Sequence, residues 1–169
     1  MKKYSLLLFL IVCMINCKIF AAEFTLKSPA FKLNTMIPTL YTCDGSNISP
    51  PLIWQDAPPN TQSFVLIVED PDSPTGSWTH WVLYNISPNL TKLDARSPVP
   101  AGASIGKNSW GTLSYRGPCP PIRAHRYVFK LYALDTRLSL EDAPIKDAVL
   151  KAMRSHVIGS TELIGLYQR

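Results

Sequence analysis

The residue types in this sequence that could do chemistry are two aspartates and two histidines. Asp70 and Asp72 lie within the polar stretch 69–81, which also contains His80, and His125 lies further along the chain. Each stands at the edge of an apolar segment, and polar turns on a rigid sheet are where binding sites are commonly built. A carboxylate beside an imidazole favours the imidazolium form, and two such histidines with nearby backbone N–H groups hold a phosphate or a carboxylate. The four residues therefore predict capture of a small anion, with the aspartates orienting the histidines.

Other chemistries are less well supported by the residue spacing. A metal site of two histidines and one carboxylate has the right residue types, but the spacings HxxxH, CxxC and HExxH are absent. Glycine-rich phosphate loops are absent as well. We expect no metal, no cofactor, no serine-hydrolase nucleophile elbow and no catalytic residue. The alternative is an enzyme that uses the same histidines and aspartates for acid–base chemistry.

The elements that must position these residues are mainly short strands. Apolar runs at 64–68 and 81–84 predict two buried strands around the polar stretch. Residues 125–134 alternate in polarity and predict a strand with a histidine at its edge above an apolar floor. Helical spacing over 144–156 predicts one helix near the C-terminus, followed by a final strand at 161–167.

Length and composition indicate a single domain. The 169 residues are 46% hydrophobic and 17% charged, which suits one ordinary core, and the 15 prolines favour strands joined by stiff loops. The formal charge is +5, and it falls to +2 if Lys2, Lys3 and Lys18 are removed with a leader. No run of basic residues occurs, so we expect no nucleic-acid partner.

The first 22 residues read as a secretory signal peptide, followed by one domain at 23–169. Lysines at the start, an apolar run at 6–15 and Ala21-Ala22 give the three expected regions. The protein is therefore expected to be periplasmic or secreted, with no transmembrane anchor after signal cleavage. A lipid anchor on Cys17 is the alternative, although Asn16 is a poor match to the residue that such a site prefers.

Two cysteines, Cys43 and Cys119, lie after the expected signal peptide. An even pair in an oxidising compartment favours a disulfide. Two separate thiols are the other interpretation, because sequence does not give the distance between them.

Three ordered motifs give the chain a resemblance to a known family. They are Asp70-Pro71-Asp72-Ser73-Pro74, Trp78-Thr79-His80-Trp81, and Gly117-Pro118-Cys119-Pro120-Pro121 followed by His125-Arg126-Tyr127. This pattern resembles the phosphatidylethanolamine-binding protein (PEBP) family, and the stretches 43–52 and 133–135 are similar to its bacterial Raf kinase inhibitor-like branch, the YbhB/YbcL type.

The resemblance implies a mostly β fold of antiparallel sheets with short helices, and a C-terminal helix followed by a final strand. It also implies a small pocket for a phosphate-like anion or a phospholipid head group. The positions that it maps onto the ligand-binding pocket are Asp70, His80, Pro121, His125 and Tyr127, and Asp72 and Gly117 lie beside them as further ligand-binding candidates. Cys119 stands where animal members carry a different small residue. A protein partner, with the pocket or a loop inhibiting a hydrolase or protease, is a further alternative that relatives suggest.

Overall fold

The computed structural model describes residues 22–169. The expected signal peptide, residues 1–22, therefore lies outside the described residues except for Ala22. No helix within the described range has the length and apolar character needed to cross a membrane.

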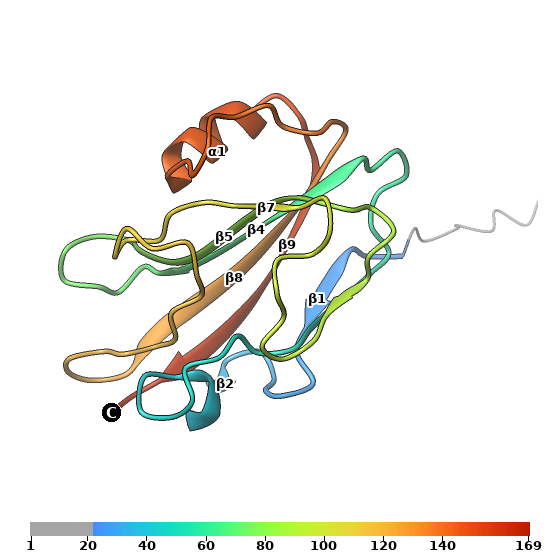
Figure 1. Ribbon diagram of the computed structural model, residues 1–169. Coiled ribbons are helices and arrows are strands. Elements are labelled where there is room, and N and C mark those ends of the chain that lie inside the picture. The colour runs from blue at the N-terminus through green and yellow to red at the C-terminus, as the bar shows by residue number, and fades with distance from the viewer. Residues whose placement is uncertain (1–21) are drawn as a thin grey trace, which may run out of the picture.

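Two β-sheets form the body of the protein (Figure 1). The larger sheet has six strands in the order β2-β9-β8-β4-β5-β7, and all its neighbours are antiparallel except β2 and β9. Its strands are β2 (Thr35–Met36), β4 (Ser63–Asp70), β5 (Trp78–Ile86), β7 (Ser104–Ile105), β8 (His125–Leu134) and β9 (Val157–Tyr167). The smaller, antiparallel sheet has the order β1-β3-β6. Its strands are β1 (Thr25–Lys27), β3 (Leu52–Gln55) and β6 (Lys92–Leu93).

The main core fills the space between the two sheets. Trp54 of β3 packs edge-on against Phe64 of β4, with ring centroids 5.6 Å apart. The alternation in β8 is clear, because Tyr127, Phe129 and the residues that follow at every second position are buried. The predicted strand at 125–134 is therefore confirmed at both ends.

A second apolar layer covers the other face of the large sheet. The helix α1 (Lys146–Met153) buries Val149 and Met153 against residues of β4 and β5, and Figure 1 shows it lying across these strands. The predicted helix forms, but it is shorter than its apolar spacing indicated. Ile145 is its N-cap and is 57% exposed, and the chain turns after Met153 before β9 begins. The mostly β fold with a C-terminal helix and a final strand is thus confirmed.

A β-bulge places one of the predicted site residues. Val68 of β4 pairs with Trp81 of β5, but the next residue of β4, Glu69, pairs with Thr79. His80 is therefore an extra residue in β5, and such bulges redirect a side chain. His80 contacts Tyr127 edge-on at 5.2 Å, so its ring lies on the face that looks toward the inter-sheet core.

Candidate functional site

A cavity of about 340 Å³ opens at the end of the large sheet where β4 ends and where β5 and β8 begin. Five of the seven predicted ligand-binding residues line it. The residues that line the cavity are Asp70, Ser73, Pro74, Thr75, Trp78, His80, Trp110, Cys119, Pro121, His125 and Tyr127. None of these is a lysine or an arginine, so any positive charge at the cavity wall must come from the histidines.

Asp70 and His125 form a buried pair at the base of the site. His125 Nδ1 lies 2.8 Å from Asp70 Oδ2, and the two side chains are only 2% and 7% exposed. The other carboxylate oxygen of Asp70 accepts a hydrogen bond from the backbone N–H of Asp72 at 2.9 Å. Because both oxygens of Asp70 have partners, this carboxylate holds the histidine in place. His125 Nδ1 is engaged, which leaves Nε2 as the ring nitrogen available to a ligand.

Asp72 lies beside the cavity and pairs with an arginine, and, contrary to our expectation, it does not orient a histidine. Its carboxylate accepts hydrogen bonds from the backbone N–H and the Nε of Arg126, both at 2.9 Å, and from Nη2 at 2.7 Å. The side-chain hydrogen bonds from Arg126 are the main reason why the pKa of Asp72 falls to about 2. Asp72 does not line the cavity. It fastens the turn after β4 to the start of β8 through Arg126, the residue that follows His125.

His80 is held by a backbone carbonyl, whereas we expected a carboxylate. Its Nδ1 lies 2.5 Å from the carbonyl oxygen of Arg116, so Nδ1 carries the proton and Nε2 remains for a ligand. Burial lowers the pKa of His80 below its usual value, and the Arg116 carbonyl and the Asp70 charge oppose that shift. The expectation that an aspartate orients each histidine is therefore wrong for His80 and right for His125.

Tyr127 lines the cavity, and its hydroxyl group is buried. The side chain is 1% exposed, and its hydroxyl oxygen is one of two buried side-chain polar atoms among residues 22–169 that have no hydrogen-bond partner. Burial, followed by the charge of Asp70, raises the pKa of this phenol. Buried polar groups are normally paired, so this unpaired hydroxyl is an exception at the edge of the site.

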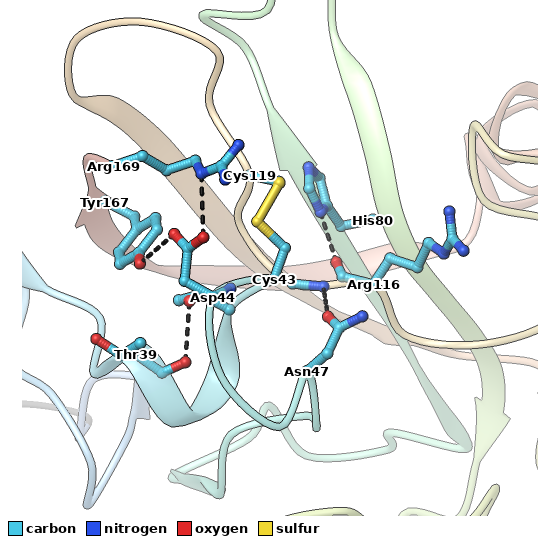
Figure 2. Close-up of a disulfide and its surroundings, with 11 residues drawn as sticks. Thr39, Cys43, Asp44, Asn47, His80, Arg116, Cys119, Tyr167 and Arg169 are labelled. Atoms are coloured by element: carbon cyan, nitrogen blue, oxygen red, sulfur yellow. Dashed lines mark hydrogen bonds and ion pairs between the residues drawn. A yellow bond between two sulfur atoms is a disulfide. The ribbon is translucent and has the colours of Figure 1, made fainter.

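The proline-rich segment forms one wall of the cavity through Pro121 and Cys119. Gly117 lies outside the cavity lining, and its backbone N–H donates to Asn47 Oδ1 at 2.7 Å. The predicted disulfide is present, because Cys43 and Cys119 are bonded with their Cα atoms 5.4 Å apart. Figure 2 shows that this bond joins the loop that contains Cys43 and Asn47 to the segment that contains Arg116 and Cys119.

Two tryptophans that the sequence did not assign to the pocket line the cavity. Trp78 and Trp110 meet edge-on with centroids 5.4 Å apart, and Trp110 also contacts His80 edge-on at 5.1 Å. Asn108 presents Trp110 by accepting hydrogen bonds from the backbone N–H groups of Trp110 and Thr112, both at 3.0 Å. Trp78 lies inside one of the motifs, two residues before His80. Because residues two apart in a strand lie on the same face, this spacing could have predicted that Trp78 lies beside His80. No local signal places Trp110, since its loop reaches the cavity only in the folded chain.

One expectation about nucleophiles needs correction. Residues 102–106, Gly-Ala-Ser-Ile-Gly, do match the G-x-S-x-G spacing of a nucleophile elbow. In that motif the serine stands on a sharp turn between a strand and a helix. Here Ser104 lies in the short strand β7, paired with Tyr84 of β5, and it does not line the cavity. The G-x-S-x-G spacing is therefore present, but the strand–turn–helix geometry of a nucleophile elbow is not. The structure also places no cluster of three or more potential metal-ligating His, Cys, Asp or Glu residues within the range it describes.

Comparison with known proteins identifies the family. The family model described as phosphatidylethanolamine-binding protein matches residues 27–168, and this chain belongs to that family. A UPF0098 protein of Methanothermobacter thermautotrophicus is 53% identical over 148 residues, which cover 85% of this chain and 98% of that protein.

Two solved structures share the fold. The putative PEBP homologue CT736 from Chlamydia trachomatis has a TM-score of 0.83 at 43% identity, with 87% of this chain and 98% of that chain covered. YbcL of E. coli, described as a member of the mammalian PEBP family, has a TM-score of 0.81 at 31% identity, with 88% and 99% covered. The resemblance carried by the three motifs is therefore confirmed at the level of family and fold.

Proposed function

We propose that this protein is a binding protein that captures a small phosphate-like anion outside the cytoplasm and does not turn it over. The observation that carries the proposal is the convergence of His80 and His125 on one cavity, each with Nδ1 engaged elsewhere. Both rings therefore keep Nε2 for a ligand. A histidine fixed in this way is a pre-oriented hydrogen-bonding group, and it becomes a charged donor when it is protonated.

The tautomer of His80 indicates the protonation state of the ligand. When neutral, His80 offers a lone pair at Nε2, because its proton on Nδ1 is directed at the Arg116 carbonyl. A fully deprotonated anion would meet that lone pair unfavourably. A phosphate or phosphomonoester that carries one proton can donate its P–OH to His80. At lower pH the protonated ring instead donates to a deprotonated oxygen.

The dimensions of the cavity favour a head group over a larger molecule. A volume of about 340 Å³ lies at the lower end of the range for small-molecule sites. The aromatic rings of Trp78, Trp110 and Tyr127 supply apolar walls, and the polar groups are few. We therefore propose inorganic phosphate and phosphoethanolamine as probes, the latter being the head group in the name of the family. The disulfide supports an oxidising location such as the periplasm.

The test is calorimetry with inorganic phosphate and with phosphoethanolamine at pH 6 and pH 8, after treatment with a chelator. We expect binding that survives the chelator. We also expect His125→Ala to cost about 1.5–3 kcal/mol of binding free energy, the scale of a charge-assisted hydrogen bond. Because phosphate itself titrates between these pH values, sulfate serves as a control whose charge stays constant. Sulfate affinity should fall as pH rises, since protonated histidines are its donors.

Three results would count against the proposal. Affinity that disappears with the chelator would favour a metal site. Affinity that is unchanged by both His80→Ala and His125→Ala would place the binding site elsewhere. Turnover of p-nitrophenyl phosphate or p-nitrophenyl acetate that is lost in His80→Ala would show an enzyme that uses the same residues for acid–base chemistry.

A further inference from the structure

The disulfide lies at the cavity, and its two cysteines differ in their surroundings. Cys119 lines the cavity and is an exposed residue, whereas Cys43 is half-buried. The bond links positions separated by 76 residues in the chain. Disulfides that solvent can reach are more open to attack by an external thiol than buried ones.

The bond fastens the segment that orients a site histidine. Residues 116–119 run alongside the loop that follows the short helix η1 (Thr39–Tyr41), and the backbone N–H of Cys43 donates to the Pro118 carbonyl at 3.0 Å. Arg116, three residues before Cys119, supplies the carbonyl that holds His80 Nδ1. Figure 2 shows the disulfide and this histidine contact on the same segment. Loosening of this segment would therefore reach the binding site directly.

The loop on the Cys43 side has an anchor that does not depend on the disulfide. Asp44 accepts hydrogen bonds from Tyr167 Oη at 2.8 Å and from Arg169 Nε at 3.1 Å, which tie the loop to the end of β9 (Figure 2). Within the part of the chain that the structure describes, residues 120–124 form no hydrogen bond that would anchor the other side beyond Cys119. Ile122 is 68% exposed, and Arg123 has a left-handed φ of 44°, which disfavours this backbone for a residue with a side chain. If the disulfide opens, residues 119–124 are the freest to move, and residues 116–118 keep their hydrogen bonds to His80, Asn47 and Cys43.

We propose that the Cys43–Cys119 bond is a thiol–disulfide exchange site for a dithiol reductant, and that its reduction weakens anion binding by releasing this cavity wall. One thiolate of the dithiol attacks Cys119 Sγ, and Cys43 Sγ leaves as a thiolate and takes up a proton. The second thiol of the reductant then attacks its own sulfur in the mixed disulfide and releases Cys119. The dithiol is oxidised to a disulfide, and its two electrons and two protons end on the two cysteine thiols. The effect on binding rests on the proposed anion-binding function, whereas the site of attack does not.

The first test locates the attack. The folded protein is treated with reduced glutathione, quenched by alkylation and digested for mass spectrometry. We expect glutathione on Cys119 and the alkyl group on Cys43. Glutathione found mainly on Cys43, or no reaction until denaturant is added, would overturn the proposed exchange site.

The second test measures the consequence for the cavity. Phosphate binding to the oxidised protein is compared with binding after dithiothreitol, while circular dichroism confirms that the fold persists. We expect affinity to fall at least tenfold on reduction and to return on reoxidation. The double variant Cys43→Ala/Cys119→Ala should bind as weakly as the reduced protein and should not respond to dithiothreitol. Equal affinity of the oxidised and reduced proteins would contradict the control of binding.

A separate readout distinguishes failure of the redox proposal from failure of the proposed function. Amide hydrogen exchange of a peptide that spans residues 116–119 reports on the wall without any ligand. We expect faster exchange in the reduced protein. If the oxidised protein binds no phosphate but this exchange still accelerates, the proposed function fails and the redox-sensitive wall stands. Unchanged exchange on reduction would refute the redox-sensitive wall itself.

Discussion

Replacement of Asp70 by asparagine should destabilise the protein and weaken anion binding together. The asparagine oxygen can still accept the backbone N–H of Asp72, but its amide group would face His125 Nδ1, which now lies 2.8 Å from a carboxylate oxygen. One buried charge-assisted hydrogen bond is lost, and such bonds contribute about 1.5–3 kcal/mol. We expect Asp70→Asn to lower the free energy of unfolding by about 2 kcal/mol. Phosphate affinity should fall at least tenfold because His125 changes tautomer or orientation.

Asp72→Asn is the matched control for this prediction. Asp72 lies two residues away and pairs with Arg126, the residue after His125, but its side chain is 24% exposed and that of Arg126 is 54% exposed. Ion pairs with this much solvent contribute about 0–1 kcal/mol. We expect Asp72→Asn to lower the free energy of unfolding by at most about 1 kcal/mol, the range for exposed pairs, and to change phosphate affinity little.

Urea unfolding at pH 7, followed by tryptophan fluorescence, measures both variants, and calorimetry measures binding. If Asp72→Asn lowers the free energy of unfolding as much as Asp70→Asn does, the distinction between the buried Asp70–His125 pair and the more exposed Asp72–Arg126 pair is refuted. So would an unchanged phosphate affinity in Asp70→Asn.

The Asp72 pair also predicts a dependence on acid. The pKa of Asp72 falls from an ordinary 3.8 to about 2 in the folded protein, mainly through hydrogen bonds from Arg126. The unfolded chain therefore takes up this proton first as pH falls, and the stabilisation present above pH 3.8 is lost toward pH 2. The stability difference between the wild type and Asp72→Asn should shrink across this window. If the difference in unfolding free energy stays constant between pH 5 and pH 2, the Asp72–Arg126 pair does not contribute to stability in this way.

Three further predictions concern other groups at the site. Burial lowers the pKa of His80, so the unfolded chain takes up this proton first as pH falls below about 6.5, and the anion-free protein should lose stability there. His80→Gln should reduce that loss of stability, as measured by urea unfolding at several pH values. Reduction of the Cys43–Cys119 bond should lower the free energy of unfolding by about 4 kcal/mol in the chain-entropy model, as measured by urea unfolding with and without reductant. Tyr127→Phe removes an unpaired buried hydroxyl and should leave thermal stability unchanged or raise it, whereas Tyr115→Phe removes a 2.9 Å bond to a backbone carbonyl and should lower it.

The sequence predicted the β8 strand and its histidine well, because that strand follows a strict alternation over a buried floor. The start of β5 was harder to predict. The apolar run indicated a strand from Trp81, but β5 begins at Trp78, and the bulge at His80 places two consecutive residues on the inner side. Single-sequence periodicity does not reveal a bulge, since the extra residue is defined only by the pairing with β4.

The roles of individual polar residues depended on contacts that are distant in sequence. Asp70 and Asp72 have the same residue type and neighbouring prolines, yet Asp70 meets His125 and Asp72 meets Arg126, 55 and 54 residues away. The motif brought both carboxylates near the site, but it did not show that only Asp70 lines the cavity and pairs with a histidine. The group that holds His80 is the backbone carbonyl of Arg116. Every residue has such a carbonyl, so the residue type does not predict this contact.

The most direct test of the account is nuclear magnetic resonance of the protein with ¹⁵N-labelled histidine, recorded during titration with inorganic phosphate. The chain contains three histidines. His156 pairs with Asp135 at 2.9 Å and does not line the cavity, so it is an internal control. We expect large shifts at Nε2 of His80 and His125, smaller shifts at their Nδ1 atoms, and none at His156. Shifts confined to His156, or saturable phosphate binding that leaves both cavity histidines unchanged, would contradict the claim that these two residues hold the anion.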